Sequence, residues 1–568
     1  MKVSDYIVEF LIGKGVSDVF GYPGGMVTHL MDSFDKRKTE IAAHVNYHEQ
    51  GAAFAACGYA QATGKTGVAY ATSGPGATNL ITGICHAWFD SVPVVFITGQ
   101  VNTFEAKGEY TVRQRGFQET DIVGMVQGVT KYSVRIDSIE KVVEELEKAW
   151  RIAQEDRKGP VLLDVPMNIF RSDLNLTDYR KNDDREGERK PQETFEEVVT
   201  ALEQAKRPCI LVGAGVRGEG CRKSLAEASS KLNVPVVTSM IAVDLLPDAG
   251  KNGYGFVGAY GSRIANFIVA KSDLVLTLGA RLDVRQVGGK RENFAPDAKI
   301  IRVDIDPGEL AYKVREDETD IQADAGCVLQ YLTRQWKKPA DYFTEWISVC
   351  DNIKISLAGM DDRSANRMMT ALSEKLPAEC VVTTDVGQNQ VWVAQSFKVQ
   401  KKQRILFSGG HGAMGYSLPA AIGAYYSTGK TVVSFNGDGG FQMNIQELQF
   451  IAREELPIKV IVFNNYALGM IRHFQEMYFE SNFVQTVSGN GYGVPNLQKI
   501  AEAYGLDYHR YADVQEIDGA FMQNARPALV EVVLDEPTYV FPKLEFGKPN
   551  QDQEPLIDRK EFDRLMDL

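Results

Sequence analysis

The feature that most constrains this chain is a strand–turn–helix–strand unit at residues 431–465. A β-branched and aromatic run at residues 431–435 leads into the turn Gly-Asp-Gly-Gly at residues 437–440, and a second apolar strand occupies residues 458–463. The apolar residues between these strands recur at helical spacing and predict one helix with a single buried face: Phe441, Ile445, Leu448 and Ile451. The unit is a βαβ crossover, which requires a parallel sheet.

Two polar side chains end the strands of this unit. Asp438 follows the first strand and Asn465 follows the second, so both lie at the carboxyl edge of the sheet, where open α/β sheets bind ligands. A carboxylate, an amide oxygen and a nearby carbonyl are hard oxygen ligands that suit Mg²⁺. The glycines beside Asp438 let the backbone approach a diphosphate, whose charge a helix N-terminus favours. The turn alone would also fit a plain loop, so the prediction depends on the complete unit.

Short apolar runs alternate with helical patterns along most of the chain. Buried parallel strands have this pattern, with crossover helices between them. The predicted strands are at residues 68–70, 94–98, 161–165, 209–212, 274–278, 300–305, 381–384, 431–435 and 458–463. The predicted fold class is α/β, with three doubly wound parallel-sheet domains.

Composition divides the chain into segments. The charged stretch at residues 172–192 has almost no apolar content and is predicted to be a linker. It separates a first domain at residues 1–171 from a central domain at residues 193–335, and a third domain follows at residues 355–545. The polar tail at residues 546–568 is expected to wrap over the surface.

The charge and cysteine content exclude several classes of protein. The 568 residues carry 62 Lys and Arg against 75 Asp and Glu, a net charge of −13, which argues against nucleic-acid and acidic-membrane binding. The seven cysteines are scattered without a CxxC pair or a Cys/His cluster, so neither a disulfide framework nor a zinc site is predicted. The first residues do not match a secretory signal, and no apolar run is long enough to span a membrane. We expect a cytoplasmic enzyme that acts on small molecules.

The unit at residues 431–465 resembles the thiamine diphosphate (ThDP) motif of a family of decarboxylases and carboligases. The resemblance implies that Asp438, Asn465 and the carbonyl group of Ala467 hold Mg²⁺ against the diphosphate of the cofactor. It also implies further ThDP contacts: Val386, Gly387, Gln388, Asn389, Gly437, Gly439, Gly440, Leu468, Gly469 and Met470. Close relatives carry His at the position of Asn389.

A ThDP enzyme also needs one buried glutamate, because a carboxyl group at N1′ of the aminopyrimidine ring promotes loss of the thiazolium C2 proton. Glu49, in the segment HEQGAA, precedes a helix of small residues and is the candidate. In isolation it would equally fit an exposed position at a helix N-terminus. Together with GYPGG, TSGPGATN, PVVFITGQV and GFQETD, this segment resembles the pyrimidine-binding domain of acetolactate synthases.

The resemblance to acetolactate synthases covers about residues 1–545. It implies a carbonyl contact from Gly412 to the cofactor and an apolar wedge at Met414, for which ordinary core packing is the alternative. In this family the cofactor lies between the pyrimidine-binding domain of one chain and the diphosphate-binding domain of another. Glu49 and Asp438 would then face each other across a subunit interface. We expect a homodimer or a tetramer, with a separate regulatory subunit as a further candidate partner.

A Gly-x-Gly-x-x-Gly pattern opens the central domain. No acidic residue follows at the spacing that a ribose requires, so NAD is not predicted. Acetolactate synthases that carry FAD hold it in this domain, and the resemblance implies FAD contacts at the matching positions: Gly213, Gly215, Gly258, Arg281, Asp304, Asp306 and Asp324. The loop GFVGAYG departs from the family's pattern, and some relatives keep the domain without the flavin.

The implied reaction starts with a 2-oxo acid, most directly pyruvate, which loses CO₂ on the cofactor before the remaining fragment joins a second carbonyl compound. Arg285 matches the arginine that contacts the substrate carboxylate, which a guanidinium binds through two hydrogen bonds. A surface arginine in a loop is the alternative. Gln100, Phe117 and Gln118 are expected to line the pocket over the thiazolium ring. Lys131 is expected to help place the acceptor.

Two departures from the family concern the acceptor. Phe474 stands where branched-chain synthases commonly place Trp, and the loop at residues 102–119 is longer and carries Arg113 and Arg115. The tail resembles synthase-like proteins of surface-polysaccharide pathways, in which the acceptor is a nucleotide-linked ketosugar. Acetolactate formation is the first hypothesis and a ketosugar or other carbonyl acceptor is the second.

Two further classes remain as weaker alternatives. A decarboxylase that releases free aldehyde would place paired histidines in the first domain, and these are absent after Gln100. A non-catalytic homologue that only binds cofactor or partners conflicts with the intact Glu49, Asp438 and Asn465.

Overall fold

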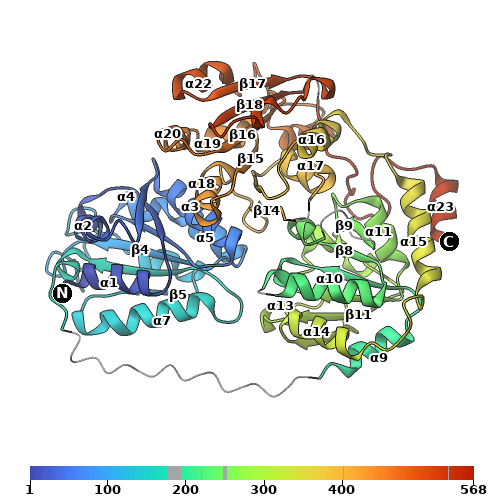
Figure 1. The fold of residues 1–568 in the computed structure, drawn as a ribbon, viewed down its shortest axis with the longest axis horizontal. Coiled ribbons are helices and arrows are strands. Elements are labelled where there is room, and N and C mark those ends of the chain that lie inside the picture. The colour runs from blue at the N-terminus through green and yellow to red at the C-terminus, as the bar shows by residue number, and fades with distance from the viewer. Residues whose placement is uncertain (176–193, 219, 247–251, 401, 535–536) are drawn as a thin grey trace.

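The computed structural model describes residues 1–175, 194–218, 220–246, 252–400, 402–534 and 537–568. These residues form three lobes, each built on one six-stranded parallel sheet (Figure 1). Most of the predicted linker at residues 172–192 lies outside the described residues.

The three sheets follow two strand orders. The first sheet has the order β2 (Ala42–Val45), β1 (Asp18–Gly21), β3 (Gly67–Ala71), β4 (Val94–Gln100), β6 (Val161–Pro166), β5 (Tyr132–Arg135). The third repeats it with β14 (Arg404–Phe407), β13 (Val381–Thr384), β15 (Val432–Gly437), β16 (Ile458–Asn464), β18 (Ala528–Val533), β17 (Asp507–Tyr511). The central sheet has β12 (Thr319–Gln322), β11 (Lys299–Asp304), β10 (Leu274–Leu278), β7 (Pro208–Val212), β8 (Val236–Thr238), β9 (Gly253–Phe256). All three orders reverse inside the sheet, and such a reversal opens a crevice at the carboxyl edge.

Helices connect the strands of each sheet. In the first lobe these are α1 (Val3–Gly13), α2 (Thr28–Lys36), α3 (Glu49–Thr63), α4 (Pro75–Asn79), α5 (Ile81–Phe89), α6 (Ile122–Val126), α7 (Val142–Gln154) and α8 (Met167–Phe170). In the central lobe they are α9 (Glu196–Gln204), α10 (Cys221–Leu232), α11 (Arg263–Lys271), α12 (Val284–Val287), α13 (Pro307–Ala311) and α14 (Ala325–Gln335). The remaining helices are α15 (Thr344–Leu357), α16 (Ser364–Glu374), α17 (Gln388–Ser396), α18 (Ser417–Thr428), α19 (Asp438–Met443), α20 (Glu447–Arg453), α21 (Gly469–Tyr478), α22 (Leu497–Tyr504) and α23 (Arg559–Asp567). No helix in the described part of the chain has the length and apolar content needed to cross a membrane.

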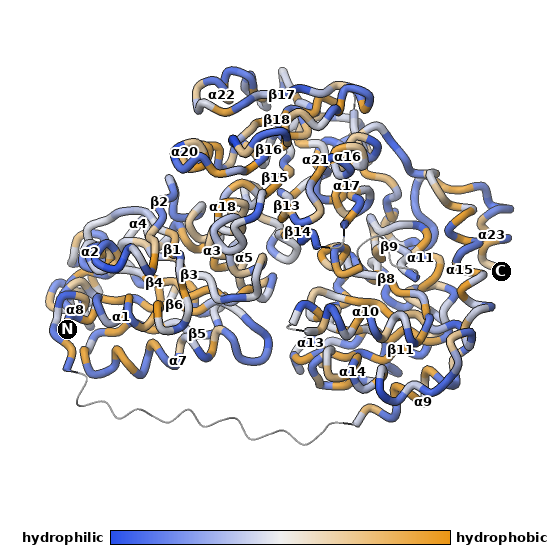
Figure 2. The backbone as a smooth tube through the Cα atoms, in the orientation of Figure 1, coloured by the Kyte–Doolittle hydropathy of each residue, from blue (hydrophilic) through white to orange (hydrophobic). Residues whose placement is uncertain are grey.

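The predicted fold class is confirmed. Each of the nine predicted strands is present, and no end differs by more than two residues from the expected one. Apolar side chains concentrate in these strands, as Figure 2 shows, because helices cover both faces of a parallel sheet.

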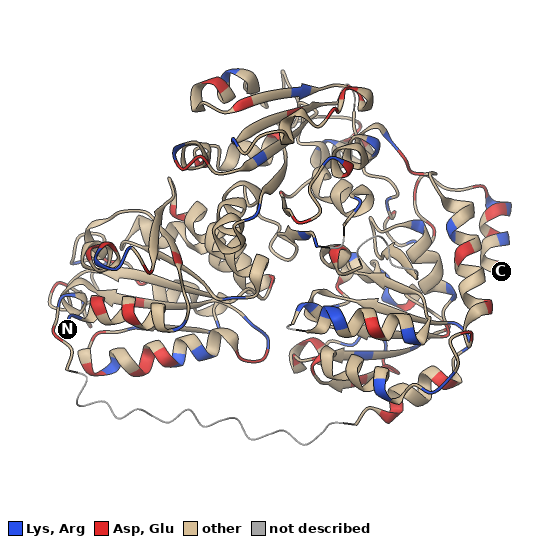
Figure 3. Ribbon diagram, viewed as in Figure 1, with Lys and Arg blue, Asp and Glu red and all other residues tan. Residues whose placement is uncertain are grey.

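The first and third lobes share one core. Helix α3 packs on α18 along a surface of small residues, and the ribbon of both helices is almost entirely the colour of uncharged residues in Figure 3. A Cβ atom at Gly58 would lie 2.1 Å from the Ala420 carbonyl oxygen, and one at Gly423 would lie 1.7 Å from the Ala55 carbonyl oxygen. Only glycine allows backbones to approach this closely, so the two positions fix how the lobes meet.

One predicted helix is broken in the structure. The prediction of a single helix after the Gly-Asp-Gly-Gly turn was wrong, because α19 ends at Met443 and α20 starts at Glu447. The side chain of Asn444 donates to the Gly415 carbonyl oxygen at 2.8 Å, and a side chain that binds backbone elsewhere competes with the helix.

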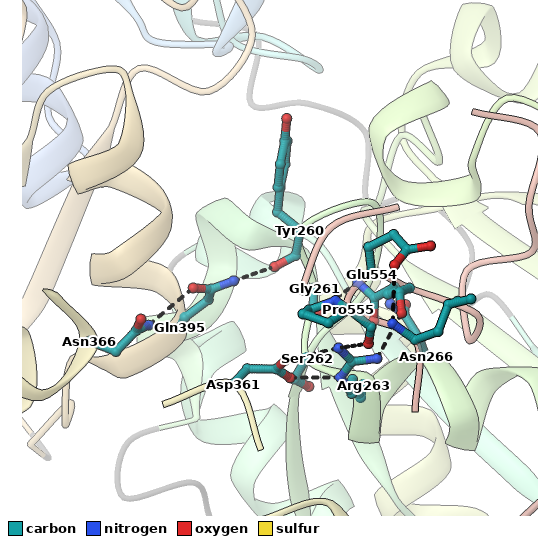
Figure 4. Close-up of polar contacts among 12 residues, drawn as sticks. Tyr260, Gly261, Ser262, Arg263, Asn266, Asp361, Asn366, Gln395, Glu554 and Pro555 are labelled. Atoms are coloured by element: carbon teal, nitrogen blue, oxygen red, sulfur yellow. Dashed lines mark hydrogen bonds and ion pairs between the residues drawn. The ribbon is translucent and has the colours of Figure 1, made fainter. Parts of the chain in front are cut away.

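Part of the tail at residues 546–568 is buried rather than lying on the surface. Arg263, buried at the start of α11, donates to both carboxylate oxygens of Asp361 and to the carbonyl oxygens of Gln553 and Pro555, at 2.7–2.9 Å (Figure 4). Gln553 itself is fully buried, as is Leu565 of α23. The expectation of a polar surface tail missed these contacts, because the residues that anchor the tail are themselves polar.

Candidate active site

Three oxygen atoms converge between the ends of β15 and β16. Asn465 Oδ1 lies 3.3 Å from Asp438 Oδ2 and 2.9 Å from the carbonyl oxygen of Ala467. Neighbouring ligands of an octahedral Mg²⁺ are about 3 Å apart, since each metal–oxygen distance is about 2.1 Å. The three predicted metal ligands are therefore together, and their chemistry fits a magnesium ion.

Two hydrogen bonds on the side away from Asp438 fix the orientation of the Asn465 amide. Its Nδ2 donates to Gln388 Oε1 at 2.9 Å and to Thr538 Oγ1 at 2.6 Å, which turns Oδ1 toward Asp438. Gln388 also donates to the Thr538 carbonyl oxygen at 2.6 Å. Thr538 was not predicted, because it follows the last strand with no pattern around it.

Asp438 is buried beside a second residue that the sequence did not indicate. The hydroxyl group of Tyr492 donates to Asp438 Oδ1 at 2.7 Å. Burial raises the pKa of Asp438 to about 6, and this hydrogen bond opposes the rise. A buried carboxylate without a cationic partner is costly, and a bound divalent cation would remove that cost.

Glycines and nearby side chains form a close-fitting cradle around Asp438. A Cβ atom at Gly439 would lie 2.5 Å from Leu468 Cδ2 and 3.2 Å from Met414 Cε, and one at Gly469 would lie 2.1 Å from Gln388 Oε1. The predicted ThDP contacts are thus neighbours here, and glycine at these two positions lets the side chains of Leu468 and Gln388 pack directly on the backbone. Gly437 has the amide of Asn389 beside it, Gly387 has a positive φ of 126°, and Met470 packs on the core of the third lobe.

Asp385, at the end of β13, organises the loop that carries Gly412 and Met414. Its carboxylate accepts hydrogen bonds from the backbone N–H groups of Val386, Gly415 and Ser417 at 2.7–3.2 Å. Burial raises its pKa to about 7. A Cβ atom at Gly440 would lie 2.6 Å from Asp385 Oδ1, so this carboxylate also explains that glycine. The sequence signal was an acid directly after an apolar strand.

Glu49 begins α3 and is buried, with 8% of its surface exposed. The Nδ2 atom of Asn79 donates to Glu49 Oε2 at 3.0 Å, and a Cβ atom at Gly76 would lie 3.2 Å from Oε1. His48 caps the helix by accepting from the N–H group of Gln50. Burial excludes the alternative of an exposed helix residue. In the described residues the hydrogen bonds of Glu49 and those of the Asp438 group involve different partners.

The residues expected over the thiazolium ring have different surroundings. Gln100 is buried at the end of β4 and donates to the Thr120 carbonyl oxygen (2.7 Å) and to Asp164 (3.0 Å). Gln118, with a φ of 64°, packs on Gly74, whereas Phe117 is 80% exposed. Gln100 therefore shapes the loop rather than offering a free amide to a ligand.

The loop at residues 102–119 is ordered around one carboxylate. Glu119 accepts from the backbone N–H groups of Lys107, Arg115 and Gly116 at 2.7–3.2 Å. Arg115 donates to the Ala106 carbonyl oxygen, and the side chain of Arg113 is exposed. Three backbone N–H groups of the loop are thus held by the Glu119 side chain, and Glu105 and Asn168 hold its first residues, Asn102 and Thr103.

Lys131 precedes β5 and Glu49 follows β2, so the two residues belong to the outer strands on opposite sides of the first sheet. The ammonium group of Lys131 donates to the Glu155 carbonyl oxygen at 2.6 Å. Its expected role in placing the acceptor stays a prediction.

Arg285 lies on the one-turn helix α12 and its side chain is exposed. Asp283 accepts from its N–H group at 2.8 Å, and its carbonyl oxygen accepts from Ala259. The neighbouring Tyr260 is partly buried, and its carbonyl oxygen accepts from Gln395 of α17, as Figure 4 shows. The backbone of Arg285 is thus hydrogen-bonded to Ala259, whose neighbour Tyr260 contacts the third lobe.

The predicted FAD residues gather at the carboxyl edge of the central sheet, but most are engaged. The N–H groups of Gly213 and Gly215 donate to the carbonyl oxygens of Leu278 and Gly279. The side-chain carboxylates of Asp304, Asp306 and Asp324 each accept a hydrogen bond from a backbone N–H group two residues further along the chain. Arg281 forms an ion pair with Glu309. Gly258 has a φ of 115°, and a Cβ atom there would lie 2.2 Å from the Arg285 carbonyl oxygen, so both the backbone conformation and the close approach require glycine.

Two buried hydroxyl groups at this edge still fit a polar ligand. Thr238 Oγ1 and Ser239 Oγ follow β8 and have no hydrogen-bond partner among the described residues. Buried hydroxyl groups are rarely left without a partner. These two hydroxyl groups could therefore form hydrogen bonds with a polar ligand such as a flavin nucleotide.

Comparisons with known proteins agree with this geometry. Residues 1–125, 195–332 and 385–532 match the N-terminal TPP binding domain, the central domain and the C-terminal TPP binding domain of the thiamine pyrophosphate enzymes. The acetolactate synthase isozyme 2 large subunit of Escherichia coli is 34% identical over 97% of this chain and 99% of its own length. The acetolactate synthase large subunit of Lactococcus lactis is 33% identical over 96% of this chain and 94% of its own length. The probable acetolactate synthase large subunit of Methanocaldococcus jannaschii is 34% identical over the whole chain and 98% of its own length.

The glycine cradle, the buried glutamate and these full-length similarities point the same way, and the predicted family is confirmed. The chain belongs to the thiamine pyrophosphate-dependent enzymes, in the family of acetolactate synthase large subunits.

Proposed function

We propose that this enzyme decarboxylates pyruvate and joins the remaining two-carbon unit to a second 2-oxo acid, forming a 2-acetolactate. The convergence of Asp438, Asn465 and the Ala467 carbonyl oxygen beside a glycine cradle is the observation that carries this proposal. It supports a site for Mg²⁺ and a diphosphate on the same chain as a buried Glu49. The names of the full-length relatives support the choice of product.

Bound ThDP supplies a carbon nucleophile and an electron sink for the loss of CO₂. Glu49 Oε would hold the proton shared with N1′ of the aminopyrimidine ring, and Asn79 keeps the carboxyl group in place for this role. Asp438, Asn465 and Ala467 would hold Mg²⁺, which would supply positive charge for the diphosphate. Arg285 pairs with the substrate carboxylate, and Phe117 and Phe474 exclude water from the reacting carbon atoms.

The site is proposed to be completed by a second copy of the chain, with Glu49 of one copy opposite Asp438 of the other. The different hydrogen-bond partners of these two residues within one chain support this arrangement. A homodimer is the smallest such assembly and a tetramer a larger one, and the large subunits among the relatives support a separate regulatory subunit as a further partner. A cytoplasmic location, supported by five buried cysteine thiols, belongs to the same proposal.

FAD is proposed to bind at the carboxyl edge of the central sheet. The unpartnered Thr238 and Ser239 hydroxyl groups support it. The absorption spectrum of the purified protein tests it directly. A flavin band that is reduced in Thr238→Val is the expected result, and a protein that takes up no FAD on incubation would contradict the proposal.

A nucleotide-linked ketosugar is the second candidate acceptor. The exposed Arg113, on the loop that Glu119 holds, favours it because a guanidinium suits a diphosphate. Acetolactate and acylated sugar are measured together from pyruvate with and without the ketosugar, in the parent protein and in Arg113→Ala/Arg115→Ala. The exposed Arg151 of α7, changed to Ala, is the matched control.

For the acetolactate proposal we expect ordinary rates from pyruvate alone and little effect of the double change. Acylated sugar as the main product, with an acceptor KM that rises in the double variant, would replace it by the second candidate. Free acetaldehyde would show a simple decarboxylase, and a protein that consumes no pyruvate would show a non-catalytic homologue.

A further inference from the structure

A second buried glutamate lies between the two predicted halves of the active site. Glu447 is the first residue of α20 and is fully buried. Arg453 of the same helix pairs with Glu454 instead, at 2.8 Å. Burial raises the pKa of Glu447 to about 7, which reflects the cost of an ionised carboxyl group in this environment. A buried carboxyl group is unfavourable unless hydrogen bonds compensate for its lost hydration, so the partners of Glu447 indicate its role.

The hydrogen bonds of Glu447 all run to the turn that precedes Glu49. Its Oε2 accepts from Asn46 Nδ2 at 2.9 Å and its Oε1 accepts from the backbone N–H group of Tyr47 at 3.0 Å. Asn46 is itself fully buried. This turn joins β2 to α3, and Glu49 begins the helix immediately after it. Glu447 therefore binds the backbone N–H group of Tyr47 and the side chain of Asn46, two and three residues before the catalytic candidate.

Two further contacts join the segment around Glu447 to the first turn of α3. A Cβ atom at Gly51 would lie 2.4 Å from Glu447 Oε1, so the first turn of α3 is in direct contact with the carboxylate and needs glycine there. Asn444, in the break between α19 and α20, approaches Gln50 Oε1 at 3.5 Å. The broken helix, which the sequence did not predict, is what turns both side chains toward α3.

We infer that Glu447 is a positioning residue that sets the placement of Glu49 at the aminopyrimidine ring. The inference rests on the proposed role of Glu49. Because catalysis depends on geometry to within about 1 Å, a loosened turn would lower the rate without removing any group that touches the cofactor. The alternative is that Glu447 only fastens two lobes together and contributes stability alone.

The exchange of the ThDP C2 proton for deuterium separates these roles, since it reports what Glu49 does to the bound cofactor and requires no substrate. It is measured by quenched proton NMR on the full chain loaded with ThDP and Mg²⁺. In Glu447→Gln the new NH₂ group faces the donors of the turn, and we expect exchange about 10- to 100-fold slower, with ThDP affinity retained. Gln449→Ala, at an exposed site on the same helix, is the control and should exchange at the parent rate.

Asn46→Ser removes the same contact from the opposite side and should also slow exchange. In a Glu49→Gln background, Glu447→Gln should cause no further loss, because both act through one carboxyl group. Parent-like exchange in Glu447→Gln or in Asn46→Ser, even with lowered thermal stability, would overturn the inference. If the parent protein itself does not exchange C2, the proposed function fails instead.

Discussion

At the scale of single residues, the site depends on carboxyl groups that are buried without cationic partners. Asp438, Asp385 and Glu447 each have a pKa raised by burial, and each accepts hydrogen bonds from its surroundings. Their roles differ: Asp438 faces the metal position, Asp385 orders the loop of Met414, and Glu447 contacts the turn before Glu49. The sequence indicated the first from its motif. The roles of the other two were missed because they depend on partners far away in the sequence, Gly415 and Ser417 for Asp385 and Asn46 and Tyr47 for Glu447.

Replacement of Asp438 by Ala tests the metal position. Because Mg²⁺ would bridge the protein and the diphosphate, the affinities for Mg²⁺ and ThDP should fall together, by about 10- to 100-fold. Titration calorimetry measures both. An unchanged ThDP affinity would show that the ion is held elsewhere.

Replacement of Glu49 by Gln tests the acid. The amide is close in size to the carboxyl group, so the fold and ThDP binding should be retained, but it cannot share a proton with N1′. Turnover should fall by at least about 100-fold. Circular dichroism and ThDP titration serve as controls, and a parent-like rate would remove Glu49 from the mechanism.

At the scale of elements, strand positions were predictable because buried parallel strands are nearly continuous apolar runs. The break between α19 and α20 was not, since apolar spacing continues through it and only the Asn444–Gly415 contact reveals it. Sequence motifs also do not say where in a sheet each strand lies, and only the strand orders of the structure show that β2 and β5 are the outer strands of the first sheet.

Helix α21 carries the prediction on acceptor choice. Phe474 is half exposed and contacts the rings of Tyr478 and Phe479, so a larger ring has space at this position. Phe474→Trp should shift preference from pyruvate toward 2-oxobutyrate as acceptor, by about 1–3 kcal/mol at most, the value of one methylene group. Competition between the two acceptors measures it, and an unchanged product ratio would place acceptor selection outside α21.

At the scale of the whole molecule, the shared core of α3 and α18 fixes Glu49 relative to the third lobe of its own chain. If the cofactor lies between two chains, chains with Glu49→Gln and chains with Asp438→Ala are each inactive but complement each other in a hybrid dimer. Random mixing should restore about a quarter of the parent activity, since half the dimers are hybrids with one intact site each. Co-expression followed by assay tests this. No recovery in purified hybrids would show that both residues serve the same chain's site.

The most direct test of the account is the balance of products from pyruvate with ThDP and Mg²⁺. CO₂ is quantified before acid is added, because the acid step that converts acetolactate to acetoin for its measurement releases a second CO₂. The account predicts equal amounts of CO₂ and acetolactate from the parent protein, with both lost in Glu49→Gln. Release of CO₂ without acetolactate, or no consumption of pyruvate by protein shown to bind ThDP, would contradict it.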